Sequence, residues 1–307
     1  MRETMRRVAL TLLGLLAISA LTVWVIQRPA QADQGAGDKL SLVATNSILA
    51  DMTAQVLGDR GTVRSIVPRG QDPHEYEARP EDVAAVADAD LIIANGFNLE
   101  AGWLTKLRRT AKRDAASVIT ATAAVPVYPL ANGEPDPHAW LDLSNGIRYV
   151  ATIRDALIEK DPAHAAGYRT RAAAYTQRLA ALDNEAKTTM ATIPADRRIL
   201  VTTEGAFRYF ARAYGLETLS VWQINSEQQA TPTQMRTVMD AVRKRRPPVL
   251  FRESSLPAKT MEQVSQETDT PIAAVLYTDS LAKKGVAGDT YYDMVKWNLD
   301  QVVAGLK

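Results

Sequence analysis

A proline-free run at residues 163–190 does most to constrain how this chain folds. It contains a single glycine and many alanines and arginines, a composition that favours one continuous α-helix. As one helix, its 28 residues would span about 42 Å. That is long for a crossover between neighbouring strands, so we expect the helix to run the height of the molecule and to join two halves of the fold.

Short apolar runs alternate with amphipathic, helix-type patterns on both sides of this helix. The predicted strands are residues 40–45, 62–67, 91–96, 199–203, 219–224, 249–252 and 272–277. Alternating strands and helices build mainly parallel sheets that are covered by helices on both faces. We therefore predict an α/β fold of two lobes, each a mainly parallel sheet flanked by helices, joined by one long rigid helix.

The first 32 residues have the pattern of a secretory leader. Three arginines precede an almost wholly apolar run at residues 8–26, and Ala30-Gln31-Ala32 offers a small-residue cleavage site. We expect cleavage and export to the periplasm, although the apolar run is long enough to anchor the chain in a membrane if it stays uncleaved. The predicted divisions are then a signal peptide at 1–32, a tether at 33–39, an N-terminal lobe at 40–145, a helical connection at 146–195 and a C-terminal lobe at 196–307.

Composition excludes several classes of protein. The sequence has no cysteine, which excludes disulfides, thiolate metal sites and a lipid-modified cysteine in the chain as given. Its formal net charge of +1 provides no large field for attracting nucleic acid. We expect a monomeric, exported domain whose stability depends on its hydrophobic core.

Two of the three histidines occupy the same setting, Asp72-Pro73-His74 and Asp136-Pro137-His138. The aspartates either orient the imidazoles or simply initiate turns. The third histidine, His164, has no such setting, and we expect it to be exposed.

Two carboxylates follow predicted strands of the second half, Glu204 after 199–203 and Asp279 after 272–277. Ligands of α/β proteins bind at the carboxyl ends of strands. A cation between the lobes would therefore receive two imidazoles from one side and two carboxylates from the other. Each carboxylate also has a simpler explanation, because Glu204 could interact with a helix dipole and Asp279 could cap a helix.

Four motifs in sequence order resemble those of a known family. They are Asp72-Pro73-His74-Glu75-Tyr76-Glu77 with Pro80-Glu81-Asp82, Asp136-Pro137-His138-Ala139-Trp140, Thr203-Glu204-Gly205-Ala206-Phe207 and Tyr277-Thr278-Asp279-Ser280-Leu281. The chain resembles, from about residue 40 to 306, the metal-binding (solute-binding) proteins of manganese, iron and zinc ABC importers, the cluster A-I family. The resemblance implies two α/β lobes joined by a long helix, with His74, His138, Glu204 and Asp279 as the metal ligands.

The same resemblance favours manganese as the cargo. The zinc-importing branch typically has a third histidine where this chain has Glu204, and it often has a histidine-rich loop that this chain lacks. Two imidazoles and two chelating carboxylates would supply up to about six donors, which suits Mn²⁺ or Fe²⁺ better than tetrahedral Zn²⁺. Zn²⁺ nevertheless binds such donors more tightly than Mn²⁺ does, so Fe²⁺ and Zn²⁺ are kept as alternatives.

The implied function is capture of one divalent transition metal and its delivery to the membrane permease of an ABC importer, with no enzymatic activity. An exported metallohydrolase is one alternative, with Glu75 or Glu77 as its base. A metallohydrolase needs an open coordination position for water, whereas four protein ligands leave little room. An adhesive surface protein with an incidental metal site is the other alternative.

Overall fold

The computed structural model describes residues 39–224 and 230–307, and the residues from Leu40 onward form one compact unit. The predicted signal peptide at 1–32 and the predicted tether, apart from Lys39, lie outside the described residues. Within the described part, no helix combines the length and the apolar character needed to cross a membrane.

Strands and helices alternate along the chain, except where two helices follow one another in the middle. In chain order, and leaving out short 3-10 turns, the elements are β1 (Leu40–Ala44), α2 (Ser47–Leu57), β2 (Gly61–Ser65), α3 (Pro80–Asp88), β3 (Leu91–Ala94), α4 (Leu104–Thr110), β4 (Val118–Thr120), α5 (Leu143–Lys160), α6 (Ala165–Met190), β5 (Ile199–Glu204), α7 (Arg208–Tyr214), β6 (Glu217–Trp222), α8 (Pro232–Arg245), β7 (Leu250–Glu253), α9 (Lys259–Thr268), β8 (Ile272–Leu276) and α10 (Tyr291–Leu306). The predicted α/β class is confirmed.

The first sheet has four parallel strands in the order β2-β1-β3-β4. Successive side chains of a strand point to opposite faces. Leu42 of β1 accordingly packs in an apolar cluster with residues of α2 and α5, whereas its neighbour Val43 packs with Val86 of α3 and Leu107 of α4. Helices therefore cover both faces, as the alternating pattern predicts.

The second group of strands consists of two parallel pairs, β5 with β6 and β7 with β8, and β5 also lies beside β7. Val201 of β5 packs with Val238 of α8 and Val264 of α9. Leu200, which points to the opposite face, packs in the same cluster as Phe210 of α7. This group is therefore also covered on both faces.

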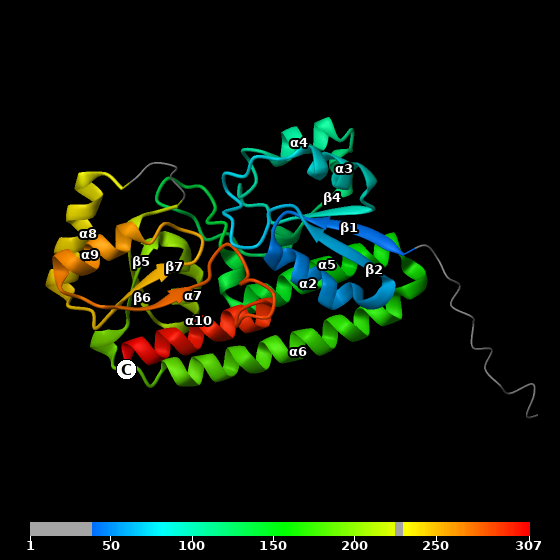
Figure 1. Cartoon of the computed structure of the whole chain (residues 1–307). Coiled ribbons are helices and arrows are strands. Elements are labelled where there is room, and N and C mark those ends of the chain that lie inside the picture. The colour runs from blue at the N-terminus through cyan, green and yellow to red at the C-terminus, as the bar shows by residue number, and fades with distance from the viewer. Residues whose placement is uncertain (1–38, 225–229) are drawn as a thin grey trace, which may run out of the picture. The chain divides into compact units, whose positions relative to one another are not determined.

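The long helix predicted at 163–190 is confirmed as α6 (Figure 1), whose 26 residues span about 39 Å. It begins two residues later than predicted, because Pro162–His164 form a 3-10 turn. Its buried apolar side chains recur at helical spacing and form one stripe: Tyr168, Ala172, Tyr175, Leu179, Leu182, Ala186 and Met190. α6 contacts α2 and α5, which pack on the first sheet. It also contacts α7 and α10, which pack on the second group of strands. α6 therefore lies against helices that pack on both groups of strands.

Two local expectations are wrong. The amphipathic pattern at residues 99–110 predicts a helix over that whole range, but α4 begins only at Leu104. The chain makes turns before it, with φ angles of 51° and 64° at Phe97 and Asn98. His164 is largely covered rather than exposed, with a side chain that is 10% accessible and an Nδ1 atom 2.8 Å from Asp161.

Candidate metal centre

All four predicted ligands lie at or beyond the carboxyl ends of strands. His74 lies in the loop between β2 and α3, and His138 immediately precedes a short 3-10 turn at Ala139–Leu141. Glu204 is the last residue of β5, and Asp279 lies in the loop after β8. The fold thus brings together four residues that are up to 205 positions apart in the sequence (279 − 74).

The donor atoms of these residues are close enough to share one ion. The two histidine Nε2 atoms are 3.3 Å apart. Asp279 Oδ1 lies 3.2 Å from Nε2 of His138 and 3.8 Å from Nε2 of His74, and Glu204 Oε1 lies 4.0 Å from Nε2 of His138. Two donors that each bind one metal at about 2.1 Å cannot be more than about 4.2 Å apart. These four separations meet this limit, so the His138 imidazole could share a cation with each of the other three residues.

The centre is almost completely closed to solvent. His138 and Glu204 are 0% exposed, Asp279 is 1% exposed, and the His74 side chain retains 7% of its accessibility. Burying carboxylates is costly unless a positive charge compensates them. A bound divalent cation would provide that compensation, and His74 marks the side nearest to solvent.

The two Asp-Pro-His motifs differ in how the aspartate is used. Asp136 Oδ1 lies 2.9 Å from the ring Nδ1 of His138 and also accepts the His138 backbone N–H. This contact directs Nε2 towards the centre and is typical of histidines that bind metals. Among the described residues, Asp72 accepts a hydrogen bond only from the backbone N–H of His74, over 2.8 Å, so it stabilises the turn. Of the two roles considered for these aspartates, Asp136 therefore has both and Asp72 has one.

Asp136 also connects the histidine side of the centre to the second group of strands. Its Oδ2 accepts a hydrogen bond from Arg208 Nη1 over 3.3 Å, and Arg208 belongs to α7. The Arg208 guanidinium lies over the Tyr128 ring, 4.2 Å from its centroid. The orientation of His138 is therefore supported from both sides of the centre.

The carboxylates on the other side are held by residues that the sequence reasoning did not identify. Glu253, the last residue of β7, accepts the backbone N–H groups of Thr203 over 3.1 Å and of Glu204 over 2.8 Å. Ser255 and Thr278 both donate hydrogen bonds to Oδ2 of Asp279. Glu253 and Ser255 lie just beyond a predicted strand, so the rule that identified Glu204 could also have identified them.

Several hydrogen bonds tie the Asp279 loop to the first sheet's loops. Arg69 donates from Nη1 to the carbonyls of Ala282 and Asp289, over 2.6 and 2.8 Å. Ser280 Oγ accepts the Gly70 N–H over 2.6 Å. The loop that carries one carboxylate is therefore fastened to the segment that leads into His74.

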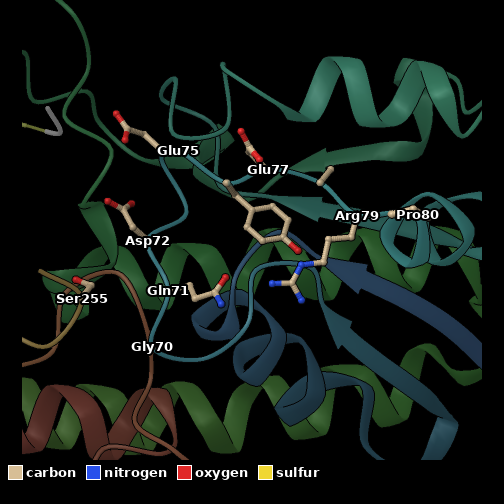
Figure 2. Close-up of a pocket in the computed structure, with 10 residues that line it drawn as sticks. Gly70, Gln71, Asp72, Glu75, Glu77, Arg79, Pro80 and Ser255 are labelled. Carbon is tan, nitrogen blue, oxygen red and sulfur yellow. The ribbon is translucent and has the colours of Figure 1, made fainter. Parts of the chain in front are cut away.

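A pocket of about 660 Å³ lies beside the centre (Figure 2). It is lined by Asp72, Glu75 and Glu77 from the His74 loop and by Ser255 from the loop after β7. A second pocket of about 390 Å³ is lined by His74 itself. Solvent therefore reaches the neighbourhood of the centre from two pockets.

Burial and charge perturb the ionisable groups strongly. Burial by itself lowers the pKa of His138, but the carboxylates of Asp136 and Asp279 raise it well above its ordinary value. Conversely, burial raises the pKa of Asp279, but the imidazoles of His138 and His74 lower it below its ordinary value. Burial raises the pKa of Glu253 to about 7. In the absence of metal, the centre therefore favours a protonated His138 beside an ionised Asp279.

Comparison with known proteins identifies relatives along nearly the whole chain. The manganese ABC transporter substrate-binding lipoprotein PsaA of Streptococcus pneumoniae is 45% identical over 303 residues, which cover 96% of this chain and 95% of the relative. The metal ABC transporter substrate-binding lipoprotein FimA of Streptococcus parasanguinis is 45% identical over 283 residues, covering 90% and 92% of the two chains.

Solved structures have the same fold. The Mn-bound periplasmic metal-binding protein from Candidatus Liberibacter asiaticus matches with a TM-score of 0.81 at 30% identity, covering 88% of this chain and 100% of that chain. The periplasmic zinc-binding protein TroA from Treponema pallidum gives a TM-score of 0.83 at 29% identity, covering 87% and 99%. A family model matches residues 42–305, and this chain therefore belongs to the family described as the zinc-uptake complex component A, periplasmic.

Proposed function

We propose that the chain is the solute-binding protein of an ABC importer, and that it captures one divalent transition metal and delivers it to a membrane permease. The observation that carries this proposal is that His74, Glu204 and Asp279 each have a potential donor atom within 4.0 Å of Nε2 of His138, in a largely buried position. His74, His138 and Glu204 each offer a ligand atom within 4.8 Å of the others. The names of the relatives, which describe substrate-binding components of metal transporters, support the same function.

Mn²⁺ is the cargo that we favour. Glu204 provides a carboxylate where a third imidazole would favour Zn²⁺, and oxygen-rich donor sets suit Mn²⁺. Relatives at 45% identity are named for manganese or for metal in general. Zn²⁺ binds such donors more tightly than Mn²⁺, so selectivity would depend on geometry, metal supply and release as well as on affinity. Fe²⁺ and Zn²⁺ are the alternative cargoes.

Release would use the division of the ligands between two lobes, which we assign to residues 40–145 and 196–307, with 146–195 connecting them. A coordination sphere tolerates an error of only about 0.2 Å. A lobe displacement of about an ångström would therefore weaken the centre. The α6 stripe packs beside both groups of strands, which supports small motions rather than a wide hinge.

The same proposal places the protein outside the cytoplasmic membrane. The leader at 1–32 would direct export to the periplasm, or residues 8–26 would remain as an anchor. The relatives named above are lipoproteins, whereas this sequence contains no cysteine to carry a lipid. Retention by a lipid on cysteine would therefore not apply to this chain.

Metal analysis of protein purified from its own exported compartment tests the proposal. We expect about one equivalent of a divalent transition metal, with Mn²⁺ predominant, and a large loss of affinity in His74→Ala. Predominant zinc would overturn the choice of manganese, whereas unchanged affinity in His74→Ala would overturn the assigned centre. A hydrolase is tested separately by assaying turnover of ester and phosphoester substrates by the metal-loaded protein, and we expect none.

A further inference from the structure

Ser255 lies beside the proposed centre and donates a hydrogen bond to one carboxylate oxygen of Asp279, a proposed ligand. Its Oγ donates to Oδ2 of Asp279 over 3.0 Å, and Oγ1 of Thr278 donates to the same oxygen over 2.7 Å. A carboxylate oxygen offers about two lone-pair directions, so the two hydroxyls saturate Oδ2. The other oxygen, Oδ1, lies 3.2 Å from Nε2 of His138. Asp279 therefore has one oxygen committed to the protein and one directed at the centre.

Ser255 is held in place by the ends of neighbouring strands. The preceding residue, Ser254, donates its backbone N–H to the carbonyl of Leu276, which ends β8. One residue earlier, the Glu253 carboxylate binds the N–H groups of Thr203 and Glu204 at the end of β5. These bonds fix the segment against the ends of β5 and β8, so the Ser255 hydroxyl has a defined position beside Asp279.

We propose that Ser255 is a specificity-determining residue which, together with Thr278, restricts Asp279 to a single metal-binding oxygen. This inference rests on the proposed function. The centre then provides four or five protein donors rather than six, depending on whether Glu204 binds through one oxygen or two. Four-coordination suits Zn²⁺, whereas Mn²⁺ benefits from additional oxygen donors. The two hydroxyls therefore limit the preference for Mn²⁺ over Zn²⁺ that a chelating Asp279 would give.

The test removes the hydroxyls that bind Oδ2 of Asp279 and counts the donor atoms around the metal. X-ray absorption spectroscopy of the Mn²⁺-loaded protein gives the number of nitrogen and oxygen neighbours, and competition titrations give the ratio of the Mn²⁺ and Zn²⁺ dissociation constants. The variants are Ser255→Ala and the double variant Ser255→Ala with Thr278→Val. Ser254→Ala is the matched control, because it lies on the same segment and leaves both hydroxyls in place.

We expect the double variant to gain one oxygen neighbour around Mn²⁺ and to shift the affinity ratio towards Mn²⁺ by about tenfold, with no change in Ser254→Ala. The single Ser255→Ala variant should shift the ratio in the same direction, and it serves if the double variant does not fold. An unchanged neighbour count and ratio in the folded variants would overturn the inference while leaving the proposed function intact. Failure of the unmodified protein to bind any metal would overturn both.

Discussion

The contrast between the two Asp-Pro-His motifs gives the sharpest prediction for mutagenesis. Asp136→Asn removes the charge 2.9 Å from Nδ1 of His138, and it places a neutral amide against the Arg208 guanidinium. Asp72→Asn is the matched control. In the part of the chain that the structure describes, the Asp72 carboxylate accepts a hydrogen bond only from the backbone N–H of His74, and an asparagine oxygen can accept the same bond. The two variants therefore make the same chemical change at two positions that differ in their contact with the imidazole.

Losing the partner of a metal-bound histidine typically reduces metal affinity about 10- to 100-fold, or about 1.4–2.7 kcal/mol. We expect Asp136→Asn to lie in this range and Asp72→Asn to change affinity less than about threefold. Competition with a fluorescent chelator measures the affinities, and nitrogen-15 NMR of the imidazoles reports whether Nδ1 of His138 keeps its proton. Thermal unfolding of the metal-free variants checks that each still folds.

Equal losses in the two variants would refute this reasoning, because they would show that the negative charge near the centre matters and the ring contact does not. An undiminished affinity in Asp136→Asn would also refute it. The NMR measurement separates these outcomes from a general loosening of the loop, since only the ring contact fixes the tautomer of His138.

Three further predictions concern the protonation of His138, the carboxylate of Glu253 and the packing of Gly146. Metal binding should release protons and weaken as the pH falls below the raised pKa of His138, because the metal needs a neutral imidazole. Titration calorimetry in buffers of different ionisation enthalpy measures the proton release, and the absence of any release at neutral pH would contradict the prediction. Glu253→Gln should destabilise the metal-free protein by about 1–3 kcal/mol in urea unfolding, because one buried N–H of Thr203 or Glu204 loses its acceptor. An unchanged free energy of unfolding would argue against a structural role for the Glu253 carboxylate. Gly146→Ala should destabilise the protein although alanine has the better helix propensity, because the new Cβ would overlap the Tyr291 hydroxyl. Adding Tyr291→Phe should recover part of the lost stability, and strictly additive effects of the two substitutions in thermal unfolding would disprove the clash.

The parts of the fold that depend on periodicity could be predicted from the sequence. The stripe on α6 and the apolar strand runs have local signatures, and the rule that ligands gather at strand ends placed Glu204 and Asp279 beside the two histidines. The start of α4 could not be predicted, because the amphipathic pattern from residue 99 continues through turns that the apolar spacing does not distinguish from a helix. The burial of His164 depends on a hydrogen bond to Asp161 that no spacing rule favours over exposure.

The strand-end rule can indicate residues such as Glu253 and Ser255, but it does not show which contacts they make. Asp72 and Asp136 have the same local sequence, and only the loop geometry decides which aspartate reaches its imidazole. Ser255 and Thr278 both reach Asp279 in the loops after β7 and β8, and although consecutive strands often pair, the sequence does not show that these hydroxyls meet one carboxylate oxygen. A single sequence therefore identified the candidate ligands and offered Asp72 and Asp136 as orienting residues, but it could not decide between the two aspartates.

Anomalous diffraction from crystals of the Mn²⁺-loaded protein tests the central claim most directly. Data on the two sides of the manganese absorption edge locate the ion independently of the protein model. We expect one strong peak about 2.0–2.3 Å from Nε2 of His74, Nε2 of His138, a Glu204 oxygen and Oδ1 of Asp279. A peak elsewhere, or an ion at this position that lacks either carboxylate, would contradict it.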